Sequence, residues 1–290
     1  MNVLEKKNFL LKERSKIPQS TSFERLLYFF LRIFFFIKEF FFFKINRNKL
    51  FFLLKKKSPL ISVITPTYNR SSILINRAVK SVLNQSYKNI EYIIVGDGCT
   101  DDTEKKINSL NNNNIHFYNI KRKIYYKKNV FNLWFVGPVR ALNYALNKCK
   151  GDWIARIDDD EVWKKNHLKE SLYFVKKKKL EFASALSITK KYKKNIKSTY
   201  YTINKKKCGA SSTYFFVSYL KHFKFNLFCW MKKNNRVNDV DLFERITSMG
   251  VKTGLRNEYS LVRTPRPGEE TVGLDQIILK KKKYKNKYLK

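Results

Sequence analysis

Three consecutive aspartates, Asp158, Asp159 and Asp160, follow a short apolar run that begins at Trp153. The run is rich in β-forming residues and comes after Gly151, so it is predicted to be a buried strand with the aspartates at its carboxyl end. Ligands bind at that edge of open α/β sheets. Adjacent carboxylates repel one another unless water screens them or a hard cation such as Mg²⁺ or Mn²⁺ neutralises them. This run alone is therefore compatible with a cation site and with a solvated acidic turn.

The elements that would position these aspartates begin with a βαβ unit. Residues 60–64 read as a buried strand that ends before Pro66, because proline cannot donate to a central ladder. A helix over residues 71–85 and a second strand over residues 90–95 follow, and the turn 96–103 comes next. Right-handed crossovers bring the ends of both strands to the same edge of the sheet as the aspartates.

The remainder of the chain alternates helical and extended patterns. Gly137 and Pro138 precede a helix whose apolar residues recur at helical spacing from Val139 to Leu146, and this helix leads into the aspartate strand. The other predicted elements are a strand over 115–119, a helix over 168–180, strands over 182–189 and 198–203, a small-residue loop over 208–213 and an amphipathic helix over 239–249.

Composition limits the class of protein. The chain of 290 residues is 43% hydrophobic and carries a formal net charge of +38. It is long and apolar enough to bury the core of one domain with appendages, which excludes a disordered protein. A basic surface could bind polyphosphates, but the lysines lie in runs without a nucleic-acid reading motif, so a nucleic-acid-binding module is the least favoured class. The joint excess of Lys, Asn, Ile, Phe and Tyr is equally typical of A/T-rich codons.

The four cysteines and three histidines show no metal-binding spacing. No CxxC pair occurs among Cys99, Cys149, Cys208 and Cys229, which indicates a reduced intracellular compartment. Each histidine is predicted to be structural, including His167, which comes after the aspartate loop.

Residues 1–57 differ in composition from the rest of the chain and contain an aromatic-rich run over residues 26–45. The run approaches the length of a membrane span, but Arg32, Lys38 and Glu39 interrupt it. A helix lying in the membrane interface accommodates such charges, and it is favoured over a helix that packs on the rest of the chain or on a second copy. The segment lacks the small-residue cleavage site of a secretory signal.

Four motifs occur in an order and spacing that resemble family 2 glycosyltransferases of the GT-A fold. They are PTYNR after the first strand, GDGCTDDT after the second, GPVRALNYAL leading to GDWIARIDDDEVW, and NDVDLFERI. The resemblance extends from Ser58 to about Arg263. It implies an α/β fold with a Rossmann-like, mostly parallel central sheet flanked by helices. The chain would then comprise an amphipathic N-terminal helical extension (1–57), a glycosyltransferase catalytic domain (58–265) and a C-terminal loop and basic tail (266–290).

The resemblance implies a nucleotide-sugar donor, held by the first two motifs and by one arginine. Pro66 and Tyr68 match positions that line the nucleobase and ribose pocket, although Tyr68 could also be a buried loop tyrosine. Asp97 matches the carboxylate that accepts a hydrogen bond from the base, and Gly96 stands where the family more often has a further aspartate. Arg140 matches a basic position that faces the donor diphosphate, and the alternative is an exposed helix residue.

By the same resemblance, the aspartate triplet binds the metal. Asp158 and Asp159 would lie near the ribose and the metal, and Asp160 would ligate the Mn²⁺ or Mg²⁺ that neutralises the leaving diphosphate.

The last motif would carry the catalytic base. Asp239 matches the residue that takes the proton of the acceptor hydroxyl in a single, inverting displacement, and Asn238 precedes it where the family usually has glutamate. An N-cap is the alternative role for Asp239. Asp241 is predicted to be a solvated acid of the first helical turn, where it suits the helix dipole.

The expected function is the inverting transfer of a sugar from a nucleotide-diphosphate donor to a hydroxyl of a surface glycan or glycolipid. The expected donor is a UDP-sugar. The N-terminal extension and the basic surface favour an anionic membrane, so the enzyme is expected to be cytoplasmic and peripheral on the inner face of the membrane. A non-catalytic glycan-binding or scaffold protein of the same fold is the alternative, since fold alone does not prove activity.

Overall fold

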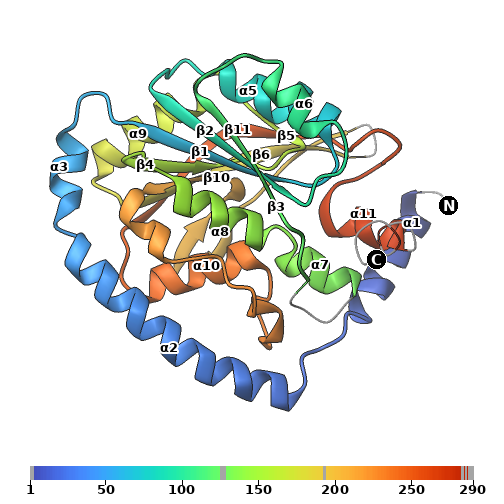
Figure 1. Ribbon diagram of the computed structural model, residues 1–290. Helices are drawn as coiled ribbons and strands as arrows, with labels where there is room; N and C mark the ends of the chain where they lie inside the picture. The colour runs from blue at the N-terminus through green and yellow to red at the C-terminus, as the bar shows by residue number, and fades with distance from the viewer. Residues whose placement is uncertain (1–2, 125–128, 192–193, 282–283, 285, 287–290) are drawn as a thin grey trace.

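The computed structural model of the protein describes residues 3–124, 129–191, 194–281, 284 and 286 (Figure 1). Its centre is a nine-stranded sheet with the order β3-β2-β1-β4-β10-β6-β11-β5, and β7 pairs with β6. A separate two-stranded sheet joins β8 and β9. The strands are β1 (Ile61–Thr67), β2 (Ile90–Asp97), β3 (Ile115–Ile120), β4 (Trp153–Arg156), β5 (Glu161–Trp163), β6 (Phe182–Lys191), β7 (Lys194–Lys197), β8 (Tyr201–Ile203), β9 (Lys206–Cys208), β10 (Ala210–Val217) and β11 (Thr253–Arg263).

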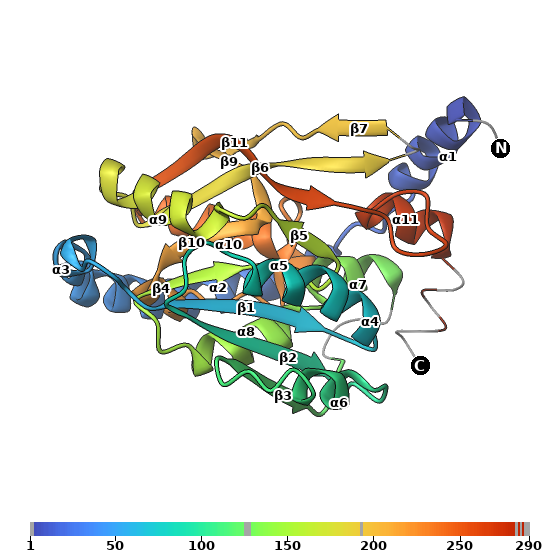
Figure 2. The ribbon, with the colours of Figure 1, turned by 90° about the horizontal axis from the view of Figure 1, so that it is seen from above.

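Helices flank both faces of this sheet. The α-helices are α1 (Val3–Ser15), α2 (Ser22–Asn46), α3 (Lys49–Lys55), α4 (Ser71–Leu74), α5 (Lys80–Leu83), α6 (Thr103–Asn108), α7 (Val130–Val136), α8 (Val139–Lys148), α9 (His167–Lys178), α10 (Asn238–Ser248) and α11 (Gly273–Leu279), and a π-helical turn (Ile75–Val79) joins α4 to α5. α8 and α10 lie on one side of the sheet, and α4, α5 and α9 on the other (Figures 1 and 2). The predicted α/β fold is confirmed.

The sheet contains a parallel half and a mixed half. β1 is parallel to both of its neighbours, β2 and β4, and β2 is parallel to β3. β10 runs antiparallel to β4 and to β6, whereas β6 and β11 are parallel. The carboxyl ends of β1, β2 and β4 therefore meet at one edge, as the βαβ pattern predicts.

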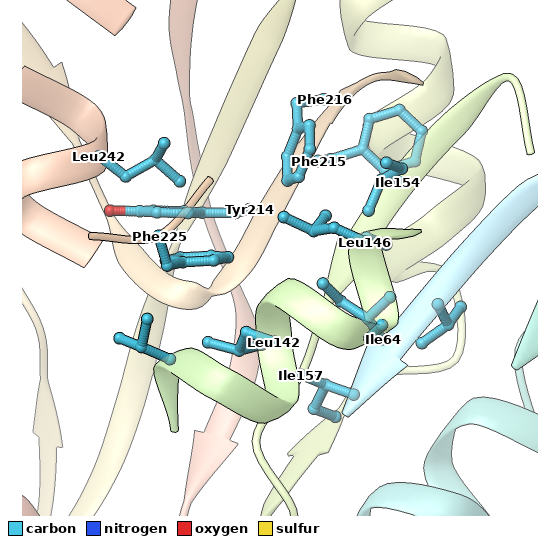
Figure 3. Close-up of a cluster of buried hydrophobic side chains, with 14 of the residues drawn as sticks. Ile64, Leu142, Leu146, Ile154, Ile157, Tyr214, Phe215, Phe216, Phe225 and Leu242 are labelled. Atoms are coloured by element: carbon cyan, nitrogen blue, oxygen red, sulfur yellow. The ribbon is translucent and has the colours of Figure 1, made fainter. Parts of the chain in front are cut away.

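Apolar side chains between the sheet and α8 hold this edge in place (Figure 3). Leu142 and Leu146 lie one turn apart on the same face of α8, and Ile64 of β1 and Ile154 of β4 pack near them. All four side chains are at most 1% exposed. This packing fixes the position of the strand ends that carry the polar residues.

Pro66 does not end the first strand, because β1 continues to Thr67. The prediction that the strand ends before Pro66 is wrong. Proline has no N–H to donate, but its nitrogen faces the side of β1 where no neighbouring strand requires that hydrogen bond. The pairing of β4 with β1 stops at Ile64, whose carbonyl accepts a hydrogen bond from the Ile157 N–H at 3.1 Å. Backbone groups alternate sides along a strand, so the nitrogen of Pro66 points to the same side, beyond the end of that pairing.

The small residues over 208–213 lie mostly in strands, so the predicted loop is wrong. β9 ends and β10 begins on either side of Gly209. A Cβ at Gly209 would lie 2.0 Å from the carbonyl oxygen of Ala185 in β6. The buried hydroxyl of Thr213 donates to that carbonyl and accepts from the N–H of Ala185. Small and hydroxyl-bearing residues, which are usual in loops, here let two strands approach closely.

Both terminal segments pack on the sheet domain. α2 buries Phe43 and Glu39 and α3 buries Leu50, an arrangement that the sequence favoured less than a purely interfacial helix. α11 and the buried Tyr284 form within the segment predicted to be a loop and tail, and residues 282–283, 285 and 287–290 of that tail lie outside the described residues. In the described part of the chain, no helix is long and apolar enough to cross a membrane.

His167 is a buried structural residue, as predicted. Its Nδ1 lies 2.8 Å from the hydroxyl of Ser260, and its ring stacks on Trp163 with the centroids 4.3 Å apart. Burial lowers the pKa of His167 well below its usual value of 6.5. The unfolded chain therefore binds a proton near pH 6.5 that the folded protein does not bind, and stability falls as the pH falls below that value.

We expect His167→Gln to flatten this acid dependence. The slope that His167 contributes is at most about 1.4 kcal/mol per pH unit. The measurement is the free energy of unfolding of both proteins between pH 7.5 and pH 5. Equal slopes in the two proteins would contradict the assignment.

Candidate active site

The carboxyl ends of β1, β2 and β4 open into one pocket of about 250 Å³. The start of α10, the C-terminal segment, and residues of α7 and α8 form its other walls. The predicted site residues that line it are Pro66, Tyr68, Asp97, Asp158, Asp159, Asp160 and Asp239. Arg140 is the one predicted site residue that is not part of the lining.

One end of the pocket combines an aromatic ring with an acid held by two arginines. The carboxylate of Asp97 accepts hydrogen bonds from Arg122 at 3.0 Å and from Arg140 at 3.1 Å. Burial raises the pKa of Asp97, and both guanidinium groups oppose the rise. The guanidinium carbon of Arg122 lies 4.1 Å from the centroid of the Tyr68 ring. Arg140 is therefore a partner of Asp97, and its alternative role as an exposed helix residue is wrong.

Two glycines shape this end of the pocket. A Cβ at Gly96 would lie 2.9 Å from the sulfur of Cys99 and 2.9 Å from the side-chain oxygen of Asn119, so the space of a second aspartate is already filled. Gly98 has φ +78°, and a Cβ there would lie 2.7 Å from the Cβ of Arg122. The absence of a side chain at Gly98 lets Arg122 approach the end of β2.

Asp159 connects the loops that follow β1 and β4. It is only 2% exposed, and its two oxygens accept hydrogen bonds from the hydroxyl of Thr67 at 2.8 Å and from Arg70 at 2.9 Å. Burial raises the pKa of Asp159, and Arg70 opposes this rise. The carboxylate of Asp159 is thus engaged with the protein on both oxygens.

Asp158 and Asp160 are more open than Asp159. One oxygen of Asp158 accepts from Arg156 at 3.0 Å, and one oxygen of Asp160 accepts from Arg266 at 2.6 Å. The second oxygen of each carboxylate has no hydrogen-bond partner within the described ranges. Burial opposes ionisation of Asp160, but Arg266 and Arg70 outweigh it and lower the pKa of Asp160. Asp160 is therefore ionised at neutral pH, and the second oxygen of each carboxylate is placed to accept a cation.

Arg156 is a buried cation in the wall of the pocket. Its side chain is 3% exposed, and its guanidinium lies 5.2 Å from the centroid of the Phe225 ring. Burial opposes its charge, but Asp158 and Asp239 outweigh burial and raise the pKa of Arg156. Among the described residues, its Nε and one terminal nitrogen have no hydrogen-bond partner. Buried N–H donors without acceptors are costly, which is typical of a group that binds a ligand.

Asp239 lies in the first turn of α10 and lines the pocket. The N-cap of this helix is Val237, so the alternative role of Asp239 as an N-cap is wrong. One carboxylate oxygen of Asp239 accepts the N–H of Val240 at 2.8 Å, which fixes its orientation. The buried amide of Asn238 donates to the carbonyl of Phe135 at 2.7 Å and ties α10 to α7. An ionised glutamate could not donate this bond, which explains Asn238 physically.

Asp241 is a buried partner in an ion-pair network, so its prediction as a solvated acid is wrong. Its carboxylate contacts Arg245 at 2.8 Å, Lys232 at 3.0 Å and the hydroxyl of Tyr28 at 3.1 Å. Burial opposes ionisation, but Arg245 and Lys232 outweigh it and lower the pKa of Asp241. Arg245 also pairs with Glu39 of α2. The network thus connects α2 to the helix that carries Asp239.

The acids of the pocket fit a divalent cation that is shared with a ligand. No group of three His, Cys, Asp or Glu side chains that could hold a metal occurs in the described part of the chain. Mg²⁺, however, is commonly held by one or two carboxylates together with substrate phosphates and water. Asp158 and Asp160 supply that number of carboxylates, each with one oxygen outside its ion pair. The donor set suits a metal that arrives with a diphosphate.

The pocket contains five arginines that were not predicted as site residues. Arg156 is the charged last residue of the otherwise apolar, buried strand β4, and a charged residue at such a position is a signal of function. The others carry no local signal. The pocket arginines are Arg70, Arg122, Arg156, Arg263 and Arg266.

Solved structures share this architecture. TarS 1-349 of S. aureus in complex with UDP-GlcNAc aligns with a TM-score of 0.54 at 17% identity, over 72% of this chain and 60% of that chain. The mannosyltransferase PcManGT of Pyrobaculum calidifontis in complex with GDP-Man and Mn²⁺ aligns with a TM-score of 0.51 at 15% identity, over 80% and 67%. At these identities the likeness concerns the fold, which is that of the GT-A glycosyltransferases.

Sequence comparison then defines the family. The profile described as "Glycosyl transferase family 2" matches residues 62–241, more than half of the chain, and the chain therefore belongs to this family. The UDP-Glc:alpha-D-GlcNAc-diphosphoundecaprenol beta-1,3-glucosyltransferase WfaP of Escherichia coli is 35% identical over 124 residues, which is 43% of this chain and 44% of WfaP. The matched region covers less than half of the length of such curated relatives.

Proposed function

We propose that the protein is a glycosyltransferase that moves a hexosyl group from a nucleotide-diphosphate donor to a hydroxyl of a glycan or glycolipid. The observation that carries the proposal is the single pocket in which Asp97, Asp158, Asp160 and Asp239 meet. A UDP-sugar is the proposed donor, because WfaP is by name a UDP-Glc transferase and the TarS structure contains UDP-GlcNAc.

In this proposal the nucleoside lies against Pro66 and Tyr68, and the base donates a hydrogen bond to Asp97. Arg122 covers the ring of Tyr68 in the free protein, so the base replaces a cation–π contact with aromatic stacking. Arg140 stays behind Asp97 and orients its carboxylate. The role of Arg140 is then to support the base contact, and not to hold the diphosphate.

Asp158 and Asp160 would hold Mn²⁺ or Mg²⁺ through their free oxygens, with Asp160 as the main ligand. The ion, when bound, neutralises charge on the leaving diphosphate. Arg156 has two N–H donors for which no acceptor occurs in the described part of the chain, and Arg266 lies beside Asp160. Both guanidinium groups are therefore placed to bind phosphate oxygens, which suit the fork of an arginine.

Asp239 is the proposed catalytic base. The acceptor hydroxyl loses its proton to the carboxylate of Asp239 as its oxygen forms a bond to the anomeric carbon and the bond to the diphosphate breaks. One displacement of this kind inverts the anomeric configuration. The hydrogen bond from the Val240 N–H holds one carboxylate oxygen and leaves the other to accept the proton.

The acceptor is proposed to be linked to a membrane lipid, because WfaP acts by name on a diphosphoundecaprenol-linked sugar. The proposed location is the cytoplasmic face of that membrane, where the enzyme is peripheral. Cys99, Cys149, Cys208 and Cys229 are all free thiols, which suits a reducing compartment.

A thermal-shift screen of nucleotide sugars with and without Mn²⁺ tests the proposal. A ligand that binds only the folded state raises the melting temperature. The stabilisation grows with the logarithm of the ratio of ligand concentration to Kd. We expect at least one UDP-sugar to raise it, and Mn²⁺ to enlarge the shift. The absence of any shift across UDP-, GDP- and dTDP-sugars would refute donor binding.

Asp160→Ala is expected to remove the Mn²⁺-dependent part of donor affinity, by about tenfold or more. The remaining contacts to the nucleoside should still give a shift without metal. Titration of Mn²⁺ at a fixed donor concentration measures the effect. Asp102→Ala is the matched control, because Asp102 is exposed and lies outside the pocket. An unchanged metal dependence in Asp160→Ala would remove Asp160 as a ligand.

A further inference from the structure

α2 turns three polar side chains, Tyr28, Arg32 and Glu39, toward the protein together with Phe43, and most of its apolar side chains toward solvent. Tyr28 donates to Asp241, and Arg32 and Glu39 form an ion pair at 3.2 Å on the same inward stripe. Glu39 is 4% exposed and pairs with the buried Arg245. The helices of soluble proteins normally show the opposite pattern, with an apolar stripe toward the core. Arg32 and Glu39, two of the charges that interrupt the aromatic run in the sequence, are therefore absent from the outer face of α2.

The outer face of α2 and α3 is a continuous apolar surface, which we call the aromatic face. Its side chains reach 73% exposure at Phe23 and Ile45 and 72% at Phe52. α2 has 25 residues, which corresponds to about 37 Å of helix. It runs along the border of the fold, and no other element of the described residues lies outside it (Figure 1). The members of the aromatic face are Phe23, Leu26, Leu27, Phe29, Phe30, Ile33, Phe34, Phe36, Ile37, Phe40, Phe41, Ile45, Phe51 and Phe52.

Such exposure is confined to one region of the molecule. Outside α1 to α3, the exposed large apolar residues of the described chain are Tyr173, Ile196 and Tyr200. Extended apolar patches on a protein surface mark sites of interaction, whereas single exposed residues are normal. The aromatic face therefore requires an apolar partner.

The fully exposed charges around the aromatic face are basic. Glu24 and Glu39 are the acidic residues between residues 22 and 57; Glu24 belongs to the capping box with Thr21, and Glu39 is buried. The exposed lysines of this segment are Lys38, Lys44, Lys49, Lys55, Lys56 and Lys57. The ammonium groups of Lys44 and Lys55 lie 5.5 Å and 3.9 Å from the rings of Phe40 and Phe51. Lysines that border an apolar surface are the arrangement of helices lying in anionic membrane interfaces.

We propose that the aromatic face lies in the interface of an anionic membrane, with the axis of α2 parallel to the membrane plane. A second copy of the chain would bring two basic surfaces together, and the like charges would oppose that contact. Anionic headgroups instead attract the lysines while the acyl boundary covers the phenylalanines. The membrane contact itself does not depend on the proposed function. Only the suggestion that this membrane carries the glycolipid acceptor rests on it.

The test is sedimentation of the full chain with vesicles of phosphatidylcholine and of phosphatidylcholine with 30% phosphatidylglycerol. We expect binding to the anionic vesicles that weakens as salt is raised. The double variant Phe34→Ser, Phe41→Ser should weaken this binding by about tenfold or more, because it removes two apolar side chains that would be buried at the acyl boundary of the membrane. Ile196→Ser with Tyr200→Ser removes the same kind of exposed side chain outside α1 to α3 and should have no effect.

A second pair of variants tests the charge of the partner. Lys38→Glu with Lys44→Glu should weaken binding to anionic vesicles by about tenfold. Lys80→Glu with Lys105→Glu makes the same charge change on α5 and α6, across the molecule from α2, and should weaken binding far less (Figure 1).

Three outcomes would overturn the proposal. They are no binding of the unaltered chain to anionic vesicles, equal binding by the phenylalanine variant and its control, and a change from dimer to monomer in the phenylalanine variant without vesicle binding. The thermal shift with a nucleotide sugar, measured on the same proteins, separates the two hypotheses. A donor shift without vesicle binding refutes the membrane face alone, and vesicle binding without a donor shift refutes the proposed function alone.

Discussion

Asp239→Asn is expected to lower sugar transfer by about 10²–10⁴ while folding and donor affinity stay close to those of the unaltered protein. Asparagine keeps the shape of the side chain and can still accept the N–H of Val240, which lies 2.8 Å from Asp239 Oδ1. It cannot take the proton of an acceptor hydroxyl at neutral pH. An interaction that is used only in the transition state changes turnover and leaves ground-state binding almost unaffected.

The measurement for Asp239→Asn is the release of nucleoside diphosphate from the donor found by the thermal-shift screen, with lipid-linked glycans as acceptor. Glu244→Gln is the matched control: this acid lies on the same helix, pairs with Lys232 at 2.5 Å and is outside the pocket lining. It should retain transfer. A folded Asp239→Asn protein with full turnover would remove Asp239 from the mechanism, and a parallel loss of stability would reassign its role to the structure of α10.

The acids of the site were predictable from sequence because strand ends are visible locally. Asp97 and Asp158 each follow a buried apolar run, and parallel strands bring such ends to one edge. Arg266 was not predictable, because its partner Asp160 is 106 residues away in the chain. Asp241 was misassigned although Arg245 and Lys232 are close to it in the chain, because a first-turn acid looks solvated until the distant Tyr28 of α2 is placed against it.

The errors in the fold also arise where tertiary contacts override local preference. Thr213 and its small neighbours have the composition of a loop, but contact with Ala185 makes them part of a sheet. Pro66 is tolerated in β1 because the adjacent pairing ends before it. In α2 the local pattern favoured an amphipathic helix, yet the sequence could not show that Arg32 and Glu39 lie on the buried stripe.

That buried stripe makes α2 part of the stability of the whole domain. Glu39 and Asp241 both pair with Arg245. Arg32, on the same helix as Glu39, forms a second ion pair with it. Burial raises the pKa of Glu39, although Arg245 and Arg32 oppose the rise. The remaining donors of Arg245 reach the carbonyl of Lys224 at 2.5 Å. Each oxygen of Glu39 therefore has an arginine partner, and removal of Glu39 leaves a guanidinium donor buried without an acceptor.

Glu39→Leu is accordingly expected to lower the free energy of unfolding by about 3–5 kcal/mol, the usual effect of removing one partner of a buried ion pair. Chemical denaturation at neutral pH measures it. Glu270→Leu is the matched control, because Glu270 is 57% exposed and pairs with Lys6 at the surface, and it should melt almost as the unaltered protein does. If Glu39→Leu were as stable as its control, α2 would be an appendage. A large loss instead makes α2 a structural element between the proposed membrane face and the helix of Asp239, so that deletion of residues 1–57 should unfold the domain.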